Sequence, residues 1–129
     1  MGDVSISEAD RRHVLIVEDD EDSRDMLSQL AELYGYRAVA VGTARDAIAS
    51  AERCLPTLAL VDIGLADADG FEVAAQLRRV QGGDSVRLVA LTGYSDSAAR
   101  TRAESVGFDE FVVKPLMPEK LNELLQRYA

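Results

Sequence analysis

The sequence predicts an α/β fold built on an open, doubly wound, five-stranded parallel sheet. Short apolar runs at 14–17, 58–61, 88–91 and 111–113 are separated by segments of helical length, a pattern typical of buried parallel strands. Strand and helix patterns alternate five times along the 129 residues, with no internal break long enough for a second domain. A closed barrel would need more such units, so the open sheet is favoured.

The strands are expected where these apolar runs meet turn residues or helix breakers. Their expected ranges are 13–18, 36–41, 57–62, 86–91 and 110–113. The second range alternates only weakly between apolar and polar residues, and it predicts a short strand.

The segments between the strands place apolar residues at helical spacing. Thr43 with Asp46 three residues later resembles a capping box with a shorter acid, and Ser95 is a candidate cap for the fourth helix. Gly35 suits a helix end, and Pro118 suits a helix start. The apolar faces are Met26, Leu27, Leu30, Leu33 and Tyr34 in the first helix, Ala44, Ala47, Ile48 and Ala51 in the second, Phe71, Val73, Ala74 and Leu77 in the third, and Leu121, Leu124, Leu125 and Tyr128 in the last.

The composition is acidic, and this excludes several kinds of partner. With 14 basic and 23 acidic residues, the chain has a formal net charge of −9. Nucleic acid and anionic membrane are polyanions and are poor partners for such a chain, whereas a divalent cation or a basic protein surface suits it.

The cysteine content and the hydropathy of the chain indicate its cellular location and its domain limits. The single cysteine, Cys54, allows no intrachain disulfide and indicates a reducing compartment; we expect it to be a packing residue. No apolar stretch approaches the ~20 residues of a membrane span. Residues 1–12 lack the apolar core of a signal peptide. We therefore expect a cytoplasmic protein with a flexible tail or linker at 1–12 and one domain at 13–129.

Reactive side chains follow four of the expected strands. Glu18 and Asp19 follow the first, Asp62 ends the third, Thr92 follows the fourth and Lys114 follows the fifth. In parallel sheets the site lies at the carboxyl ends of the strands, so these groups should meet there. Crowded carboxylates suit Mg²⁺, which prefers oxygen ligands. A carboxylate beside Mg²⁺ can attack phosphorus and form an aspartyl phosphate, while an ammonium and a hydroxyl bind the phosphoryl oxygens.

Five short motifs occur in a fixed order and spacing along this pattern. Together they resemble the receiver domain of bacterial two-component response regulators, over residues 13 to 128. The motifs are Val17-Glu18-Asp19-Asp20, Asp62-Ile63-Gly64-Leu65, Asp69-Gly70, Leu91-Thr92-Gly93 and Val113-Lys114-Pro115.

The resemblance implies a flavodoxin-like fold with the strand order 2-1-3-4-5. It implies that Asp62 is the phosphoacceptor. It also implies that Asp19, Asp62 and the backbone carbonyl of Gly64 bind Mg²⁺ directly, and that Glu18 acts through water.

The resemblance also implies how the phosphoryl group is held and sensed. Thr92 and Lys114 would bind its oxygens, and Lys114-Pro115 would have the family's cis peptide bond. Thr92 would move toward the phosphoryl group, and Phe111 would rotate inward behind it. The surface of the last strand and the last two helices would then change and alter partner binding.

The sequence departs from the family pattern at several positions. Ala66 stands where proline is frequent, and Phe111 stands where the switch aromatic is often tyrosine. Gly64 and Tyr94 occupy variable positions that influence phosphate lifetime, and neither offers a carboxylate or amide to position water.

The resemblance implies protein partners and excludes classical enzyme activity. The phosphodonor would be a histidine kinase or a histidine phosphotransfer protein. The output would be a downstream effector protein or a covalently linked kinase or output domain. The chain would therefore be a stand-alone regulator or the receiver of a hybrid histidine kinase, which catalyses only its own phosphorylation and slow dephosphorylation.

Two alternatives fit the same fold class. A phosphohydrolase of the haloacid dehalogenase type also uses an aspartate nucleophile, but it has Asp-x-Asp on the first strand; here the nucleophile is on the third, and Gly64 stands two residues later. A mononucleotide-binding module would need a glycine-rich loop after the first strand, where the acidic run 18–21 stands instead.

Several other residues have simpler structural interpretations. The only histidine, His13, is expected at the surface or at a strand edge. Tyr34, Tyr36 and Phe71 are expected to be core or rim aromatics. The pairs Arg78-Arg79 and Arg100 with Arg102 are expected on solvated helix faces, the latter pair on a helix that faces partners.

Overall fold

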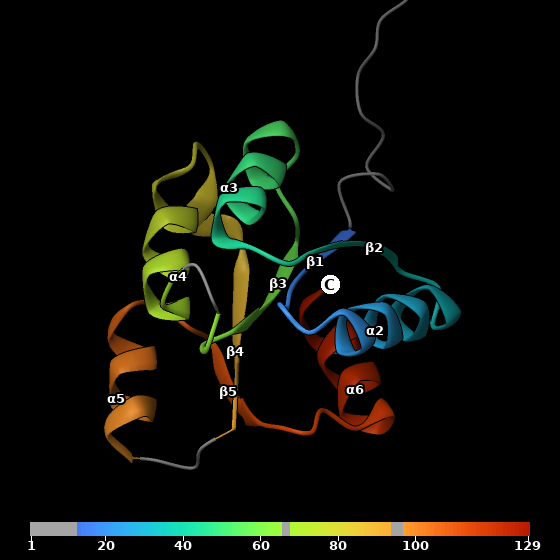
Figure 1. Ribbon diagram of the computed structural model, residues 1–129. Coiled ribbons are helices and arrows are strands. Elements are labelled where there is room, and N and C mark those ends of the chain that lie inside the picture. The colour runs from blue at the N-terminus through green and yellow to red at the C-terminus, as the bar shows by residue number, and fades with distance from the viewer. Residues whose placement is uncertain (1–12, 66–67, 94–96) are drawn as a thin grey trace, which may run out of the picture.

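A five-stranded parallel sheet forms the centre of the molecule (Figure 1). The computed structural model describes residues 13–65, 68–93 and 97–129. Its strands lie in the order β2-β1-β3-β4-β5, so the predicted fold and strand order are confirmed. The predicted limits are within one residue of those observed for β1 (His13–Val17), β2 (Arg37–Val41), β3 (Leu58–Asp62), β4 (Arg87–Thr92) and β5 (Glu110–Val113).

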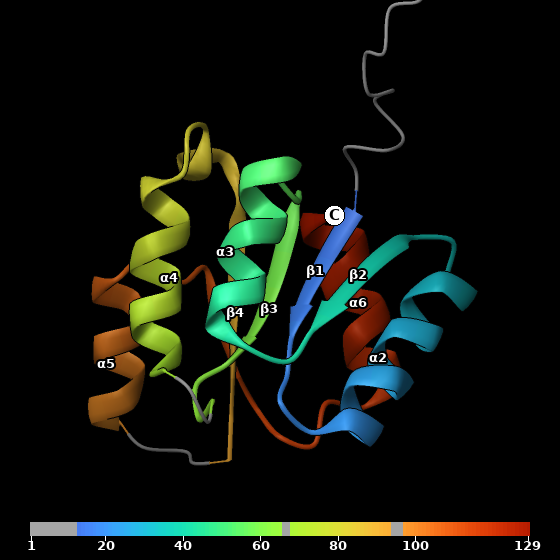
Figure 2. The same cartoon turned by 45° about the horizontal axis from the view of Figure 1, so that its top comes forward.

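Helices cover both faces of the sheet (Figures 1 and 2). One face is covered by α2 and α6, and the other by α3, α4 and α5. None of the described helices is long and apolar enough to span a membrane. The helices are α2 (Glu21–Leu33), α3 (Ala44–Arg53), α4 (Gly70–Arg79), α5 (Ser97–Ser105) and α6 (Pro118–Tyr128), and a 3₁₀ turn, η1 (Gly83–Ser85), precedes β4.

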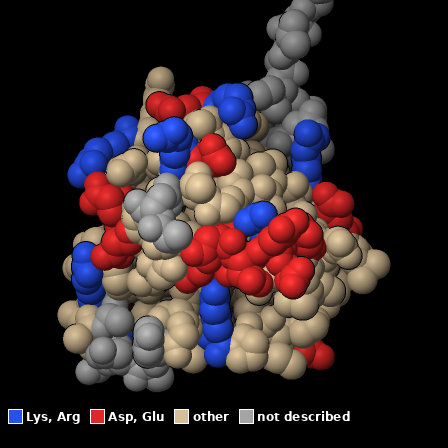
Figure 3. Space-filling model, viewed as in Figure 1, with Lys and Arg blue, Asp and Glu red and all other residues tan. Residues whose placement is uncertain are grey.

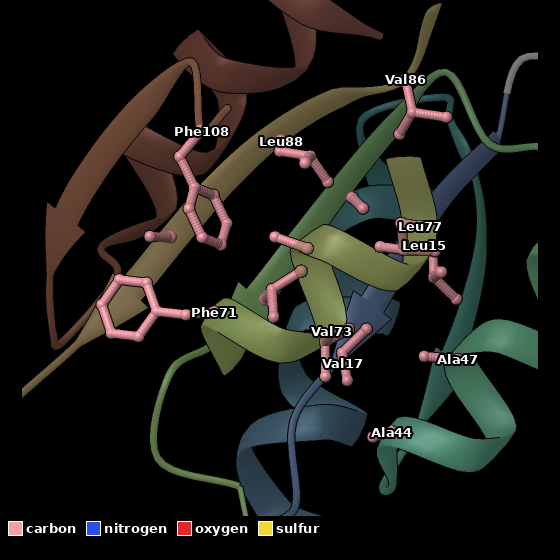
Figure 4. Packing of buried hydrophobic residues seen from close by; sticks show 14 of the residues in the cluster. Leu15, Val17, Ala44, Ala47, Phe71, Val73, Leu77, Val86, Leu88 and Phe108 are labelled. Carbon is pink, nitrogen blue, oxygen red and sulfur yellow. The ribbon is translucent and has the colours of Figure 1, made fainter. Parts of the chain in front are cut away.

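The two layers of helices produce two hydrophobic clusters because successive side chains of a strand point to opposite faces. Within β1, Leu15 and Val17 pack toward α3 and α4, whereas Val14 and Ile16 pack toward α2 and α6. Figure 4 shows the first cluster, in which the rings of Phe71 and Phe108 meet edge to face with centroids 6.3 Å apart. All residues of β1 and β3 are buried.

Side-chain caps fix the starts of α2, α3 and α4 at the carboxyl edge of the sheet. Asp20 caps α2 by accepting a hydrogen bond from the Ser23 N–H at 2.9 Å, and Asp69 caps α4. Thr43 caps α3 by accepting from the Asp46 N–H at 3.1 Å, as predicted. The expected cap Ser95 lies outside the described residues.

Several burial predictions are wrong. In α2, Met26 and Leu33 are 49% and 78% exposed, contrary to the prediction; Leu27 is buried as predicted, and Ala31 is buried although it was not predicted. The expected apolar stripe was too wide for the contact that one helix makes with a sheet. His13 is only 3% exposed because β1 is a central strand, covered on both faces and paired on both edges.

The predicted aromatic positions are confirmed: Tyr34 and Tyr36 are half-buried and Phe71 is buried. Cys54 is also half-buried, at the C-terminal end of α3.

Arg78 does not lie on a solvated helix face, contrary to the prediction. Its guanidinium donates to the carbonyl oxygens of Gly83 at 2.9 Å and Gly107 at 2.7 Å, and makes a further short hydrogen bond to the carbonyl of Val86. It also lies 3.8 Å from the carboxylate of Asp109. The side chain therefore joins the end of α4 to η1, to the residue that precedes β4 and to the turn before β5. Its neighbour Arg79 is exposed, as predicted.

Replacing Arg78 should destabilise the fold, whereas the same change at Arg79 should not. In Arg78→Ala, several carbonyl oxygens lose a charged donor, and we expect a loss of about 2–4 kcal/mol in the free energy of unfolding. Arg79→Ala should change it by less than about 0.5 kcal/mol. Urea unfolding of the two variants and the parent measures the difference. Equal stabilities for the two variants would contradict this role of Arg78.

Candidate functional site

Three carboxylates converge at the carboxyl edge of the sheet. Ligand oxygens of Glu18, Asp19 and Asp62 lie within 4.8 Å of one another. Glu18 and Asp62 are buried, and Asp19 is exposed. Figure 3 shows a patch of acidic side chains on this face, in the region where α2 begins. The predicted meeting of the strand-end acids is therefore observed.

Lys114 lies against two of these acids. Its Nζ donates to Glu18 Oε2 at 2.8 Å and to Asp62 Oδ2 at 3.1 Å. Its backbone N–H donates to the carbonyl of Thr92 at 2.7 Å, which fastens the end of β5 to the end of β4. The Lys114-Pro115 peptide bond is cis, as the family resemblance implies.

The charges at this site are only partly balanced. Burial, together with the charge of Asp62, raises the pKa of Glu18 against the lowering effect of Lys114. Burial would lower the pKa of Lys114, but its bonds to Glu18 and Asp62 hold that pKa above its ordinary value. The lysine therefore stays protonated at neutral pH, and one ammonium is shared between two carboxylates while Asp19 adds a third.

The backbone after β3 holds the Asp62 side chain and leaves one carboxylate oxygen for Lys114. The Gly64 N–H donates to Asp62 Oδ1 at 2.9 Å, and the Gly70 N–H donates to the Ile63 carbonyl at 2.9 Å. A Cβ on Gly70 would lie 2.5 Å from the Ile63 Cα and 2.6 Å from the Asp62 carbonyl oxygen. Only glycine fits there, which accounts for the Asp69-Gly70 motif.

The two candidate switch residues lie on neighbouring strands. Thr92 ends β4 and is buried; Asp62 pairs with Leu91 in the sheet register, so Thr92 stands one position farther along the adjacent strand. Phe111 is half-buried on β5, and the guanidinium carbon of Arg100 lies 5.3 Å from its ring centroid.

Four further residues were predicted to lie near this site or near the surface that binds partners. Tyr94 and Ala66 lie outside the described residues. Arg100 and Arg102 are exposed, as predicted. Each also makes a contact: Arg102 pairs with Asp69 at 3.0 Å and lies over the Phe71 ring, and Arg100 lies over the Phe111 ring.

Sequence reasoning missed Arg24 and the direct bond between Glu18 and Lys114. Arg24 Nη1 donates to the carbonyl oxygens of Glu18 at 3.0 Å and Asp19 at 3.5 Å. In the sequence, Arg24 stands about one turn into α2, the helix that follows the acidic run. An arginine at this position can equally be solvated or bind the loop, so the sequence does not predict its contacts.

The fold and site together define a flavodoxin-like α/β domain with an acidic centre at its strand ends. Residues 14–126 match the family described as response regulator receiver domain. The chain belongs to this family. A receiver is a phosphoacceptor domain of two-component systems rather than a classical enzyme, and receivers bind Mg²⁺ at the acidic site. The match favours the receiver over the phosphohydrolase and nucleotide-binding alternatives.

The relatives of the chain occur in different protein contexts. It is 34% identical over 116 residues to an uncharacterized 14.6 kDa protein of Leptolyngbya boryana, covering 90% of this chain and 88% of that one. It is 31% identical to the sensor histidine kinase AtsR of Burkholderia thailandensis, covering 89% of this chain but only 19% of the kinase. The chain also spans less than half the length of several transcriptional regulators that it matches.

A solved receiver with bound metal is also similar. The receiver domain of the sensor histidine kinase PA1611 of Pseudomonas aeruginosa has a magnesium ion coordinated in its active-site cleft. It shares 27% sequence identity with this chain and superimposes with a TM-score of 0.82, covering 91% of this chain and 96% of that one.

Proposed function

We propose that residues 13–129 form a receiver that takes a phosphoryl group on Asp62 in a Mg²⁺-dependent reaction. The donor is the phosphohistidine of a histidine kinase or of a histidine phosphotransfer protein. The observation that best supports this proposal is the position of the Asp62 carboxylate between the acid cluster and the Lys114 ammonium. In the reaction a carboxylate oxygen forms the new O–P bond, the P–N bond of the donor breaks, and the imidazole leaves.

The donor set of the site fits Mg²⁺. Three carboxylates with oxygens within 4.8 Å of one another supply the hard oxygen ligands that this cation prefers, and a shared lysine leaves them incompletely neutralised. We assign Asp19, Asp62 and the Gly64 carbonyl as direct ligands and Glu18 as a ligand through water. Bound Mg²⁺ would neutralise charge on the phosphoryl oxygens.

Lys114 and Thr92 bind the phosphoryl oxygens in this proposal. Lys114 is already charged and bonded to Asp62, so it can follow the carboxylate as the new bond forms. Its second partner, Glu18, keeps it oriented before the phosphoryl group arrives. Thr92 stands one position beyond the residue that pairs with Asp62, which suits donation of its hydroxyl from the neighbouring strand.

The kinds of partner that we propose are those of the receiver family and of the relatives of this chain. Receivers interact with histidine kinases and with effector or output domains. The relatives include a small protein of about the length of this chain as well as a much longer sensor histidine kinase. We propose that residues 1–12 serve as a flexible tail or linker. The receiver then acts either as a stand-alone regulator or as part of a hybrid kinase.

We also propose that Thr92 and Phe111 transmit the signal to the surface of α5, β5 and α6. A hydrogen bond from Thr92 to the charged phosphoryl group contributes about 1.5–3 kcal/mol. Moving a two-state equilibrium from 1:99 to 99:1 requires about 5.5 kcal/mol. Thr92 alone is insufficient, so the Lys114 contact and the inward burial of the Phe111 ring supply the remainder.

Arg100 opposes this movement of Phe111. Its guanidinium covers the ring at 5.3 Å, a contact that contributes about 0.5–1 kcal/mol at an exposed site. The contact favours the half-buried position of Phe111 before phosphorylation. The free energy gained by the contacts with the phosphoryl group must exceed the free energy of this Arg100–Phe111 contact.

Phosphorylation should depend on Asp62 and on a divalent cation. With acetyl phosphate and Mg²⁺, the intact mass of the parent should increase by one phosphate. Asp62→Asn keeps the shape of the side chain but removes the nucleophile, so its mass should not change. The parent with excess EDTA is the matched metal control and should also remain unlabelled. Equal labelling of the Asn variant would place the phosphoacceptor elsewhere.

Phe111→Ala should leave phosphorylation intact but uncouple it from the surface of α5, β5 and α6. Amide hydrogen exchange over 97–128, measured with and without a beryllium fluoride mimic, should respond in the parent and much less in the Ala variant. Phe111→Tyr is the control: it keeps the ring and adds at most about 1 kcal/mol from an outer hydrogen bond, so its response should resemble that of the parent. A full response in Phe111→Ala would mean that Phe111 only packs the core.

A further inference from the structure

Arg24 binds the main chain of the acidic loop, which we define as Glu18–Asp20. Its Nη1 donates to the carbonyl oxygen of Glu18 at 3.0 Å and, more weakly, to that of Asp19 at 3.5 Å. Its backbone N–H donates to the carbonyl oxygen of Asp20 at 2.9 Å. This backbone bond is the first i→i−4 bond of α2, accepted by its N-cap residue, so the arginine side chain itself binds the carbonyls of Glu18 and Asp19.

Gly42 provides the space in which the Arg24 guanidinium lies. A Cβ on Gly42 would be 2.7 Å from Arg24 Nη1 and 3.8 Å from the carbonyl oxygen of Glu18. Gly42 follows β2, whose last residue, Val41, accepts a hydrogen bond from the Glu18 N–H at 3.0 Å. The acidic loop is therefore held by β2 through its amide and by Arg24 through its carbonyls.

This arrangement leaves the carboxylates of the loop available for other contacts. The Glu18 carboxylate accepts from Lys114, and the Asp19 carboxylate joins the cluster with Asp62. The guanidinium adds a positive charge beside the cluster while it donates to main-chain oxygens of the same two residues. It can thus orient two acids and reduce their repulsion without occupying the carboxylate oxygens that a cation needs.

We infer that Arg24 is a positioning residue for the divalent-cation site. Held by Gly42, it fixes the backbone of Glu18 and Asp19 so that their carboxylates face Asp62. This inference rests on the proposed Mg²⁺ site. Residues that orient metal ligands typically affect metal affinity by 10–100-fold, and for this open site we expect a loss of about 10-fold.

Two variants separate the position of the guanidinium from its charge. Arg24→Gln removes both. Gly42→Ala keeps the charge but fills the space, so the far end of a flexible side chain must move away; Gly42 has no positive φ, and the fold should tolerate the methyl group. Arg53→Gln is the control. It removes one positive charge from an exposed residue at the C-terminal end of α3, whereas Gly42 lies just before the N-terminal end of that helix.

The experiment is a Mg²⁺ titration of the parent and of each full-length variant. NMR chemical shifts of the backbone amides measure the binding. The half-saturating Mg²⁺ concentration should rise about 10-fold in Arg24→Gln and Gly42→Ala, and should stay within about twofold of the parent in Arg53→Gln. With acetyl phosphate, the Mg²⁺ concentration for half-maximal labelling should rise in parallel, while labelling at saturating Mg²⁺ should return to the parent level. Thermal unfolding in EDTA checks that each variant is folded.

The possible outcomes are distinct. A parent that neither binds Mg²⁺ nor becomes labelled would refute the proposed function itself. A parent that binds Mg²⁺, with both variants indistinguishable from it, would overturn only the role of Arg24. A loss in Arg24→Gln without a loss in Gly42→Ala would mean that the charge acts at any position, which also contradicts positioning. If Arg24→Gln fails to fold, Gly42→Ala still decides the question.

Discussion

The ammonium of Lys114 lies between the buried carboxylates of Glu18 and Asp62, and the rest of the site depends on this sharing. The Nζ is 2.8 Å from one acid and 3.1 Å from the other, while Asp19 brings a third carboxylate to the cluster. Lys114 and the nearby Arg24 bring two positive charges to three acids, and burial raises the pKa of Glu18. The site thus has an excess of negative charge that a divalent cation would relieve.

The fold creates this imbalance by bringing distant strand ends together. Glu18 and Lys114 follow β1 and β5, and Asp62 ends β3. The parallel arrangement brings all three strand ends to one edge of the sheet. The backbone then sets the orientation of each group: Gly64 donates to one oxygen of Asp62, and the Lys114 amide bonds to the end of β4. The apolar strands that form the two cores therefore also position the charges.

The sequence was sufficient for the sheet, its order and the meeting of the acids, because apolar runs and motif order reflect the backbone directly. It was insufficient to predict whether a long arginine side chain is solvated or donates to a main-chain oxygen. Arg78 and Arg24 occur on amphipathic helices and have the same local pattern as the exposed Arg79. Their contacts depend on turns that come from other parts of the chain, such as the carbonyl of Gly107. Similarly, the burial of His13 depends on the central place of β1 in the sheet.

The most direct test of this account is the free energy of unfolding as a function of Mg²⁺ concentration, for the parent and for Asp19→Asn. Binding to the folded state stabilises it by about 2.7 kcal/mol when the ligand is at 100 times Kd. The parent should gain stability continuously with Mg²⁺. The Asn variant should gain little and should be more stable than the parent in EDTA, since one repelling acid is gone. A parent whose stability is independent of Mg²⁺, or an Asn variant that gains as much as the parent, would contradict the claim that these carboxylates form an incompletely neutralised cation site.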